Sequence, residues 1–155
     1  MTKTQLLQQL ERLQSENTEL KHNPNYGILT RKGLEIEHRK LTGSHHVVMI
    51  DIDYLHQLND QYGDQEPVNT LIRSAFSFRD DDLLISGNWA SGDEVAFIVK
   101  TDPQGFMFRL AASLANYGLS ATMASEPIHN NLIEACQKAL QRVYATKKLR
   151  GIQNR

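Results

Sequence analysis

Two short acidic segments stand where apolar runs begin or end. Asp93 and Glu94 follow a Ser-Gly pair and open the apolar run 95–99, and Asp51 and Asp53 close another apolar run. Carboxylates at the ends of buried strands lose hydration unless a positive charge lies next to them. Two strands that each carry acids at one end therefore predict a cradle for a divalent cation and a nucleoside triphosphate.

The composition limits the classes of protein that fit. The 155 residues are enough for one domain with its own core, and the net charge of −1 predicts no broad basic surface for nucleic acid. Cys136 is the only cysteine, so an intrachain disulfide is excluded. We find no apolar run long enough to span a membrane and no signal peptide at the start. These features predict a soluble, cytoplasmic protein with no nucleic-acid or membrane partner.

Residues 1–22 are predicted to form a dimerisation helix ahead of a globular domain over 23–155. Their seam positions alternate in steps of four and three, and they are Leu6, Leu10, Leu13, Asn17 and Leu20. A polar Asn at an a position is a known device for fixing register and two-strandedness in a parallel coiled coil. The pattern therefore favours a homodimer through this helix. The alternative is an amphipathic helix packed back on its own domain.

The rest of the chain alternates helical and strand-like segments. We predict helices over 31–40, 54–61, 66–76, 103–117 and 132–148, and strands over 46–52, 83–85, 95–99 and 119–124. Asp53 is expected to cap the helix over 54–61, and Gly63 to end it. This order predicts an α+β sandwich, in which helices cover a mostly antiparallel sheet.

Three segments carry a resemblance to a known family, the GGDEF domain of diguanylate cyclases. Residues 23–34 resemble its first motif, D-x-L-T-G-L-x-N-R-x-x-F, and residues 51–63 resemble D-x-D-x-F-K-x-I-N-D-x-x-G. Residues 91–95, Ser-Gly-Asp-Glu-Val, stand at the signature itself. Three motifs in this order are far more specific than one. The resemblance implies a ferredoxin-like, palm-type nucleotide cyclase sandwich, preceded here by the N-terminal helix.

The resemblance also implies a reaction. Cyclases of this family join two nucleoside triphosphates, and each 3′-hydroxyl attacks the other's α-phosphate while pyrophosphate leaves. The implied metal, Mg²⁺ or Mn²⁺, would be held by the side chains of Asp51, Asp93 and Glu94 and by the carbonyl of Ile52. Glu94 would stand near the attacking hydroxyl or a second metal ion.

The glycine positions of the signature would contact the nucleotide. Gly92 would let the backbone approach it closely, and Ser91 replaces the first glycine of the signature.

Nucleotide-binding positions follow from the same comparison. Asn59 matches the residue that reads guanine, whereas Val68 stands where relatives have a second guanine-reading Asp. Valine accepts no hydrogen bond from guanine, so the choice between GTP and ATP stays open. His56 takes the place of a phosphate-contacting lysine. Lys147 is our candidate for a second such lysine, although another register of that helix puts Tyr144 there.

A last motif concerns product inhibition. Arg79 and Asp82 form the R-x-x-D pattern of the family's inhibitory product site, but eight residues, 83–90, separate it from Ser91, more than in relatives.

Three functions remain open from the sequence. The leading hypothesis is a Mg²⁺-dependent homodimeric cyclase that makes c-di-GMP from GTP. The alternative is a degenerate GGDEF domain that binds a nucleotide or cyclic dinucleotide and regulates a partner, as Val68, His56 and the displaced R-x-x-D pattern indicate. A third is a purely structural dimerisation domain, which would bind neither nucleotide nor metal.

Overall fold

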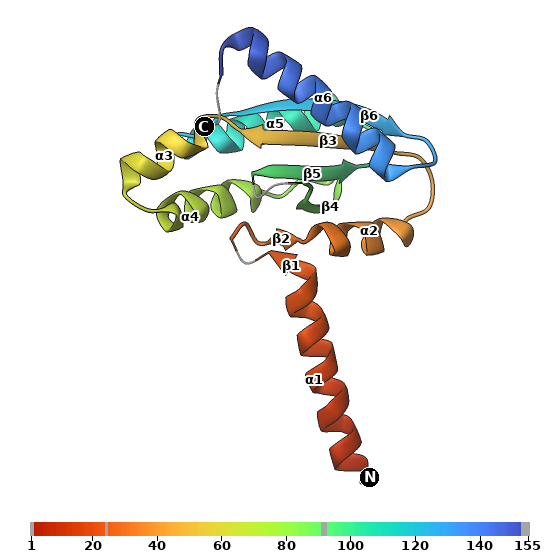
Figure 1. The fold of residues 1–155 in the computed structure, drawn as a ribbon. Coiled ribbons are helices and arrows are strands. Elements are labelled where there is room, and N and C mark those ends of the chain that lie inside the picture. Colours follow the sequence, from red (N-terminus) through yellow and green to blue (C-terminus); the bar gives the residue numbers. More distant parts are fainter. Residues whose placement is uncertain (1, 24, 91–92, 153–155) are drawn as a thin grey trace.

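A computed structural model describes residues 2–23, 25–90 and 93–152 of the chain. In this described part, six strands form one sheet in the order β1-β2-β4-β5-β3-β6 (Figure 1). The strands are β1 (His22–Asn23), β2 (Ile28–Leu29), β3 (His45–Ile52), β4 (Leu83–Asn88), β5 (Glu94–Val99) and β6 (Ala121–Ile128). The helices are α1 (Lys3–Lys21), α2 (Arg31–Arg39), α3 (Leu55–Tyr62), α4 (Gln65–Phe76), α5 (Pro103–Asn116) and α6 (Leu132–Arg150).

The predicted α+β architecture with a mostly antiparallel sheet is confirmed. All neighbouring strands pair antiparallel except β2 and β4, which are parallel. The two-residue strands β1 and β2 were not predicted, because such short segments show no periodicity. Strand β6 extends to Ile128, beyond the predicted end at residue 124. It passes through Pro127, which an edge strand tolerates because one side of it needs no N–H donors.

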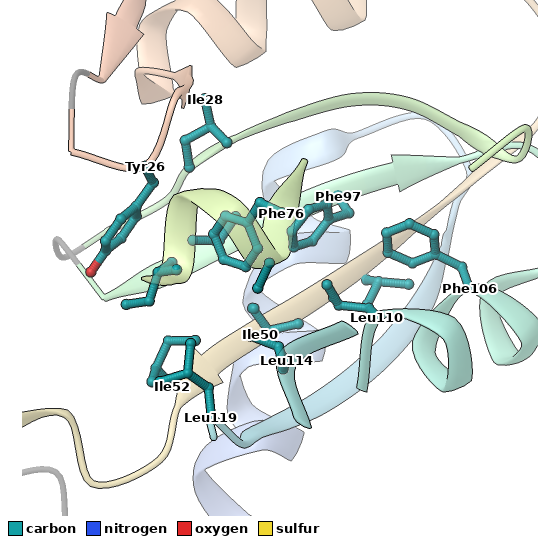
Figure 2. Packing of buried hydrophobic residues seen from close by; sticks show 14 of the residues in the cluster. Tyr26, Ile28, Ile50, Ile52, Phe76, Phe97, Phe106, Leu110, Leu114 and Leu119 are labelled. Carbon is teal, nitrogen blue, oxygen red and sulfur yellow. The ribbon is translucent and has the colours of Figure 1, made fainter. Parts of the chain in front are cut away.

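The two faces of the sheet pack against different helices. On one face, alternate residues of β3 such as Val48 and Ile50 meet α4 and α5 (Figure 2). Phe97 of β5 lies at the centre of an aromatic group there, with its ring centroid 5.3 Å from those of both Phe76 and Phe106. On the other face, Val47 and Met49 pack with residues of α2 and α6, among them the buried Cys136. This second face also carries Asp51, two residues after Met49 in the strand.

The helix ends follow local signals, with one correction. Asp102 caps α5 by accepting a hydrogen bond from the Gly105 N–H, and Gly63 ends α3 at a φ of 78°. The predicted cap at Asp53 is wrong. Tyr54 is the N-cap of α3, at a φ of 59°, and its side chain makes no capping hydrogen bond. The Asp53 carboxylate instead accepts hydrogen bonds from the hydroxyls of Ser120, just before β6, and Thr122, within β6.

Helix α1 projects away from the sheet (Figure 1). Leu6, Leu10 and Leu13 are each about half exposed, at 51%, 48% and 51%. The seam positions Asn17 and Leu20 lie outside the residues whose side chains the structure describes. The described leucines are therefore not buried against their own domain, and the homodimer stays a prediction. None of the described helices combines the length and the apolar character needed to cross a bilayer.

Candidate active site

The register of the central strands brings two acids together. Asp51 of β3 pairs directly with Glu94 of β5, so their side chains lie on the same face of the sheet. Both are buried, with relative exposures of 2% and 4%. Like charges that face each other across a ladder destabilise a sheet, and burial adds a cost for lost hydration. This pair therefore requires positive charge nearby.

A buried lysine supplies part of that charge. The ammonium nitrogen of Lys147, from α6, lies 3.1 Å from the Ile52 carbonyl oxygen, to which it donates a hydrogen bond. It also lies 3.4 Å from a carboxylate oxygen of Asp51 and 3.4 Å from one of Asp53. Lys147 is only 4% exposed. The ammonium thus contacts two of the groups that the resemblance assigns to the metal, Asp51 and the Ile52 carbonyl.

Asp53 is held by strand β6 and by the segment just before it. Its carboxylate accepts hydrogen bonds from the Ser120 hydroxyl at 3.0 Å and from the Thr122 hydroxyl at 2.8 Å. A guanidinium nitrogen of Arg150 lies 3.9 Å from the same carboxylate, at the partly exposed rim. Asp53 therefore ties the end of β3 to β6, and its carboxylate shares the Lys147 ammonium with that of Asp51.

Glu94 has a different surrounding. One of its carboxylate oxygens accepts a hydrogen bond from the Tyr144 hydroxyl, and the other, Oε2, is buried with no hydrogen-bond partner among the described residues. Burial and then the hydrogen bond to Glu94 raise the pKa of Tyr144. Of the two residues that we considered for the late phosphate contact, Tyr144 thus lies at Glu94, whereas Lys147 lies at Asp51.

Tyr26 is a neighbour of the site that the sequence analysis did not select. Its side chain is 5% exposed and packs edge-to-face on Phe76, with ring centroids 5.9 Å apart. Burial raises the pKa of its hydroxyl, and the charges of Asp93 and Asp51 raise this pKa further. The signal in the sequence was its position in the first motif, where the family has a threonine.

The signature hairpin is only partly described. Asp93 is half-buried directly before β5, and the Trp89 N–H donates to the Glu94 carbonyl at 3.0 Å, which closes the loop between β4 and β5. Ser91 and Gly92 lie outside the described residues, so their predicted contacts with a nucleotide stay predictions. The hairpin itself is confirmed.

Helix α3 carries two of the predicted nucleotide-binding residues. His56 is exposed and lies 3.3 Å from the Asp60 carboxylate. Asn59 is half-buried, and its side-chain oxygen is buried without a hydrogen-bond partner in the described part of the chain. A buried carbonyl oxygen of this kind favours a donor from outside the chain.

The predicted base-binding position at Val68 needs correction. Val68 is completely buried in the core cluster with Ile72 and Phe76 of the same helix. A side chain with no exposed surface offers a base no contact area. Val68 is therefore a core residue in this structure, and it can influence a base only through the position of α4.

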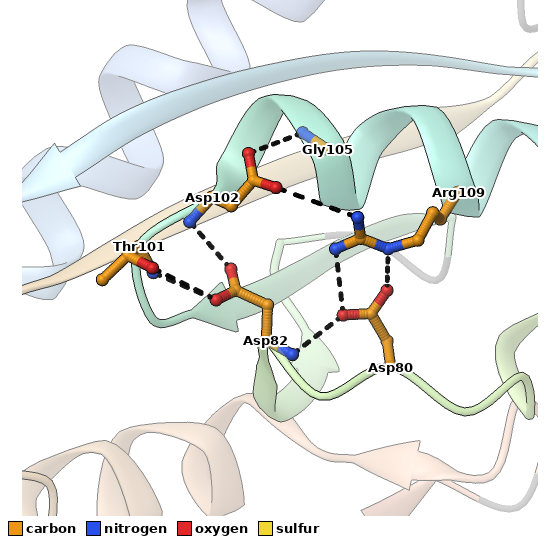
Figure 3. Close-up of polar contacts among 6 residues, drawn as sticks. All are labelled: Asp80, Asp82, Thr101, Asp102, Gly105 and Arg109. Atoms are coloured by element: carbon orange, nitrogen blue, oxygen red, sulfur yellow. Dashed lines mark hydrogen bonds and ion pairs between the residues drawn. The ribbon is translucent and has the colours of Figure 1, made fainter.

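Arg79 and Asp82 line the same open cavity of about 730 Å³. The Asp82 carboxylate accepts hydrogen bonds from the backbone N–H groups of Thr101 and Asp102, at 3.2 and 2.9 Å (Figure 3). Asp80 is bound by Arg109 at the same turn. Asp82 thus holds the start of α5, and the inhibitory site at Arg79 and Asp82 remains a prediction.

The oxygen atoms near Asp51 are ligands of the type that Mg²⁺ or Mn²⁺ prefers. Two carboxylates and the Ile52 carbonyl supply oxygen ligands, and the buried Glu94 Oε2 lacks a hydrogen-bond donor. Among the described residues, no three acidic, histidine or cysteine side chains form a metal cluster by themselves. Mg²⁺ is often held by one or two carboxylates plus substrate phosphates, so the residues fit a nucleotide-bound ion.

No family model and no curated protein matches the chain. Among solved structures, the diguanylate cyclase SiaD from Pseudomonas aeruginosa, in complex with its activator SiaC, aligns with a TM-score of 0.62 at 18% identity. That alignment covers 92% of this chain and 66% of SiaD, so the chain spans just under two thirds of that protein. The coiled coil and GGDEF domain of DgcB from Caulobacter crescentus, in complex with c-di-GMP, gives a TM-score of 0.74 at 15% identity, over 98% of this chain and 92% of that two-part chain.

A third structure is a microbial GGDEF domain described as interacting with cyclic di-GMP. It aligns with a TM-score of 0.64 at 21% identity, over 81% of this chain and 89% of that domain. Identities this low carry no argument about activity, whereas agreement over most of the chain establishes the architecture. The chain therefore has the fold of a GGDEF domain.

Proposed function

We propose that this chain is a Mg²⁺- or Mn²⁺-dependent nucleotide cyclase that condenses two GTP molecules into c-di-GMP as a homodimer. The observation that carries the proposal is the buried pair of Asp51 and Glu94, which face each other across β3 and β5. Such a pair is costly for folding, and buried acids at the ends of neighbouring strands favour a site that binds a cation. The similarity of the fold to diguanylate cyclases gives the cation a reaction to serve.

Each residue has a role in this proposal. Asp51, Asp93, Glu94 and the Ile52 carbonyl would hold the metal ion, which when bound neutralises the triphosphate and lowers the pKa of the attacking hydroxyl. Lys147 lies within reach of the same oxygens and would contact phosphate. His56 would contribute a second, weaker phosphate contact. Dimerisation through helix α1 would raise the effective concentration of one protomer's nucleotide site at the site of the other protomer.

The base would be read mainly by Asn59. Its buried side-chain oxygen has no hydrogen-bond partner among the described residues, which favours a donor from a bound base. With Val68 in the core, the chain lacks the second acidic reader, so we expect weaker discrimination between guanine and adenine than two readers would give.

The second candidate function is a binding module that holds a nucleotide or cyclic dinucleotide without turning it over. Two observations favour it: the core position of Val68, and the buried ammonium of Lys147 beside Asp51. Val68 removes an acidic base reader, and in the metal-free chain the Lys147 ammonium occupies oxygens that the cyclase proposal assigns to the metal ion.

The test is a turnover screen of the purified full chain. GTP, ATP and their mixture are incubated with Mg²⁺ or Mn²⁺, and the products are resolved by mass spectrometry. We expect c-di-GMP, and we expect Asp93→Asn and Glu94→Gln to abolish it. Glu134→Gln is the matched control, because Glu134 is an exposed acid paired with Lys138 at the far end of α6.

The outcomes separate the two functions. A cyclic product that depends on Asp93 and Glu94 supports the cyclase. Nucleotide binding by calorimetry without any product from the screen overturns the cyclase and supports the binding module. Arg79→Ala then tests whether a cyclic dinucleotide binds through the R-x-x-D pattern.

A further inference from the structure

We propose that Lys147 acts as an internal counter-ion that competes with the divalent cation for the oxygens of Asp51 and Ile52. The inference rests on the proposed function, since it concerns the metal site assigned there. It gives the lysine a role in the metal-free protein, in addition to any contact with phosphate.

The Lys147 ammonium lies on oxygens that the proposed function assigns to the divalent ion. The Lys147 ammonium donates to the Ile52 carbonyl at 3.1 Å and lies 3.4 Å from a carboxylate oxygen of Asp51. An ion bound to that carbonyl at the ~2.1 Å typical of magnesium–oxygen contacts would lie within about 5 Å of the ammonium. At this separation, inside a buried site, a divalent and a monovalent cation repel each other strongly.

The charges around Lys147 explain why it occupies this position without a metal ion. Asp51, Asp53 and Glu94 are buried, with exposures of 2%, 2% and 4%, and Lys147 is the buried cation among them. Arg150 adds positive charge only at the rim, where its side chain is 53% exposed. One ammonium does not balance three carboxylates, so the site still attracts a divalent ion. To bind there, that ion displaces Lys147 from Asp51 and from the Ile52 carbonyl.

Lys147 has the means to move. Its four-carbon stem is flexible, and Asp53 offers a third contact at 3.4 Å that lies outside the assigned metal ligands. Displacement toward Asp53 would free Asp51 and the carbonyl while the ammonium keeps a carboxylate partner. In the wild-type chain, the affinity for the divalent ion is therefore reduced by the work of this displacement.

The experiment measures binding of Mn²⁺ alone to the full chain, without nucleotide, by electron paramagnetic resonance of the free ion. Lys147→Met removes the competing charge, and we expect at least about tenfold tighter binding than in the wild type, which corresponds to about 1.4 kcal/mol. Lys147→Arg keeps the charge and should bind no more tightly than the wild type. Lys148→Met removes a charge from the exposed neighbouring position of α6 and should leave the affinity unchanged.

Folding is checked by circular dichroism, and Lys147→Gln replaces Lys147→Met in the titration if the latter does not fold without metal. Equal or weaker binding by the charge-removing variant overturns the inference and leaves the cyclase proposal standing. Absence of Mn²⁺ binding in every variant also overturns the inference, because no competition then exists in the nucleotide-free protein, but it leaves a nucleotide-bound metal site to the turnover screen. An equal increase in Mn²⁺ affinity for Lys148→Met would also overturn the inference, because the increase would then come from the change in net charge.

Discussion

Replacing Thr122 by valine tests the network that holds the end of β3. The Thr122 hydroxyl donates to the Asp53 carboxylate at 2.8 Å in a site where Thr122 is 3% exposed and Asp53 is 2% exposed. Valine has nearly the same shape and suits a strand, so the change removes this donor with little effect on packing. Asp53 keeps its hydrogen bond from Ser120 and its contact with Lys147.

The expected cost follows from the type of bond. A hydrogen bond to a charged group contributes about 1.5 to 3 kcal/mol to stability, and a buried carboxylate oxygen that loses its donor recovers little from water. We expect the free energy of unfolding to fall by about 2 kcal/mol. For a chain of this size that corresponds to a decrease in Tm of about 4 to 8 °C.

The assay is urea unfolding followed by circular dichroism, with the slope of the transition checked for constancy between variants. Thr70→Val is the matched control, since the hydroxyl of this exposed residue bonds only a backbone carbonyl within α4, and its loss should change stability by less than about 0.5 kcal/mol. A double-mutant cycle with Asp53→Asn isolates the coupling between the two side chains.

Two results would refute the reasoning. A loss below about 0.5 kcal/mol for Thr122→Val would show that the hydroxyl contributes nothing to the site. A full loss that persists unchanged in the Asp53→Asn background would show that Asp53 is not its cause and that the cost comes from packing or from the hydrogen bond that Arg150 donates to the Thr122 hydroxyl.

Three further predictions concern the core, the pH dependence and the start of α5. Phe97→Ala should lower the free energy of unfolding by about 3 to 5 kcal/mol, because it empties the centre of the aromatic group; a loss under about 1 kcal/mol in the same urea assay would contradict this. The hydrogen bond from Arg109 holds the pKa of Asp80 below its usual range, so its stabilisation is complete above that range and is lost as the pH falls through the lowered pKa. Thermal melts of Asp80→Asn should therefore fall less steeply with acidification than those of the wild type, and parallel pH profiles would argue against this contact. Gly105→Ala should lack the usual gain of about 1 kcal/mol for alanine in a helix, because its Cβ would lie 2.1 Å from a carboxylate oxygen of Asp102; the gain should return in the Asp102→Ala background, and its presence in the wild type would refute the clash.

Local signals in the sequence were sufficient for most of the elements. The Asp102-Pro103 pair and Gly63 mark helix ends through capping and turn chemistry that need no tertiary context, and the structure places α5 and α3 accordingly. The sequence placed Asp51 and Glu94 at the ends of two strands, and the structure adds that these strands are neighbours and that the two acids face each other.

Contacts between distant parts of the chain were beyond these signals. The sequence did not predict the hydrogen-bond partners of Asp53, Ser120 and Thr122, because they lie near Asp53 only when β6 pairs with β3. The same holds for Lys147, whose contacts with Asp51 and Asp53 depend on how α6 crosses the sheet. An Asp directly before a helix commonly caps it, which is why the local sequence predicted a cap at Asp53. In the structure, hydrogen bonds from Ser120 and Thr122 hold this side chain instead.

The pairing of β1 and β2 at one end of the sheet has a consequence for shortening the chain. The parallel contact between Leu29 of β2 and Gly87 of β4 covers an edge that would otherwise present unpaired backbone groups. The predicted domain boundary between residues 22 and 23 cuts through β1, where His22 pairs with Leu29. A chain started at residue 30 would leave β4 as a bare edge strand, a template for aggregation beside the signature hairpin. The short N-terminal hairpin thus covers the β4 edge of the sheet in addition to joining the sheet to α1.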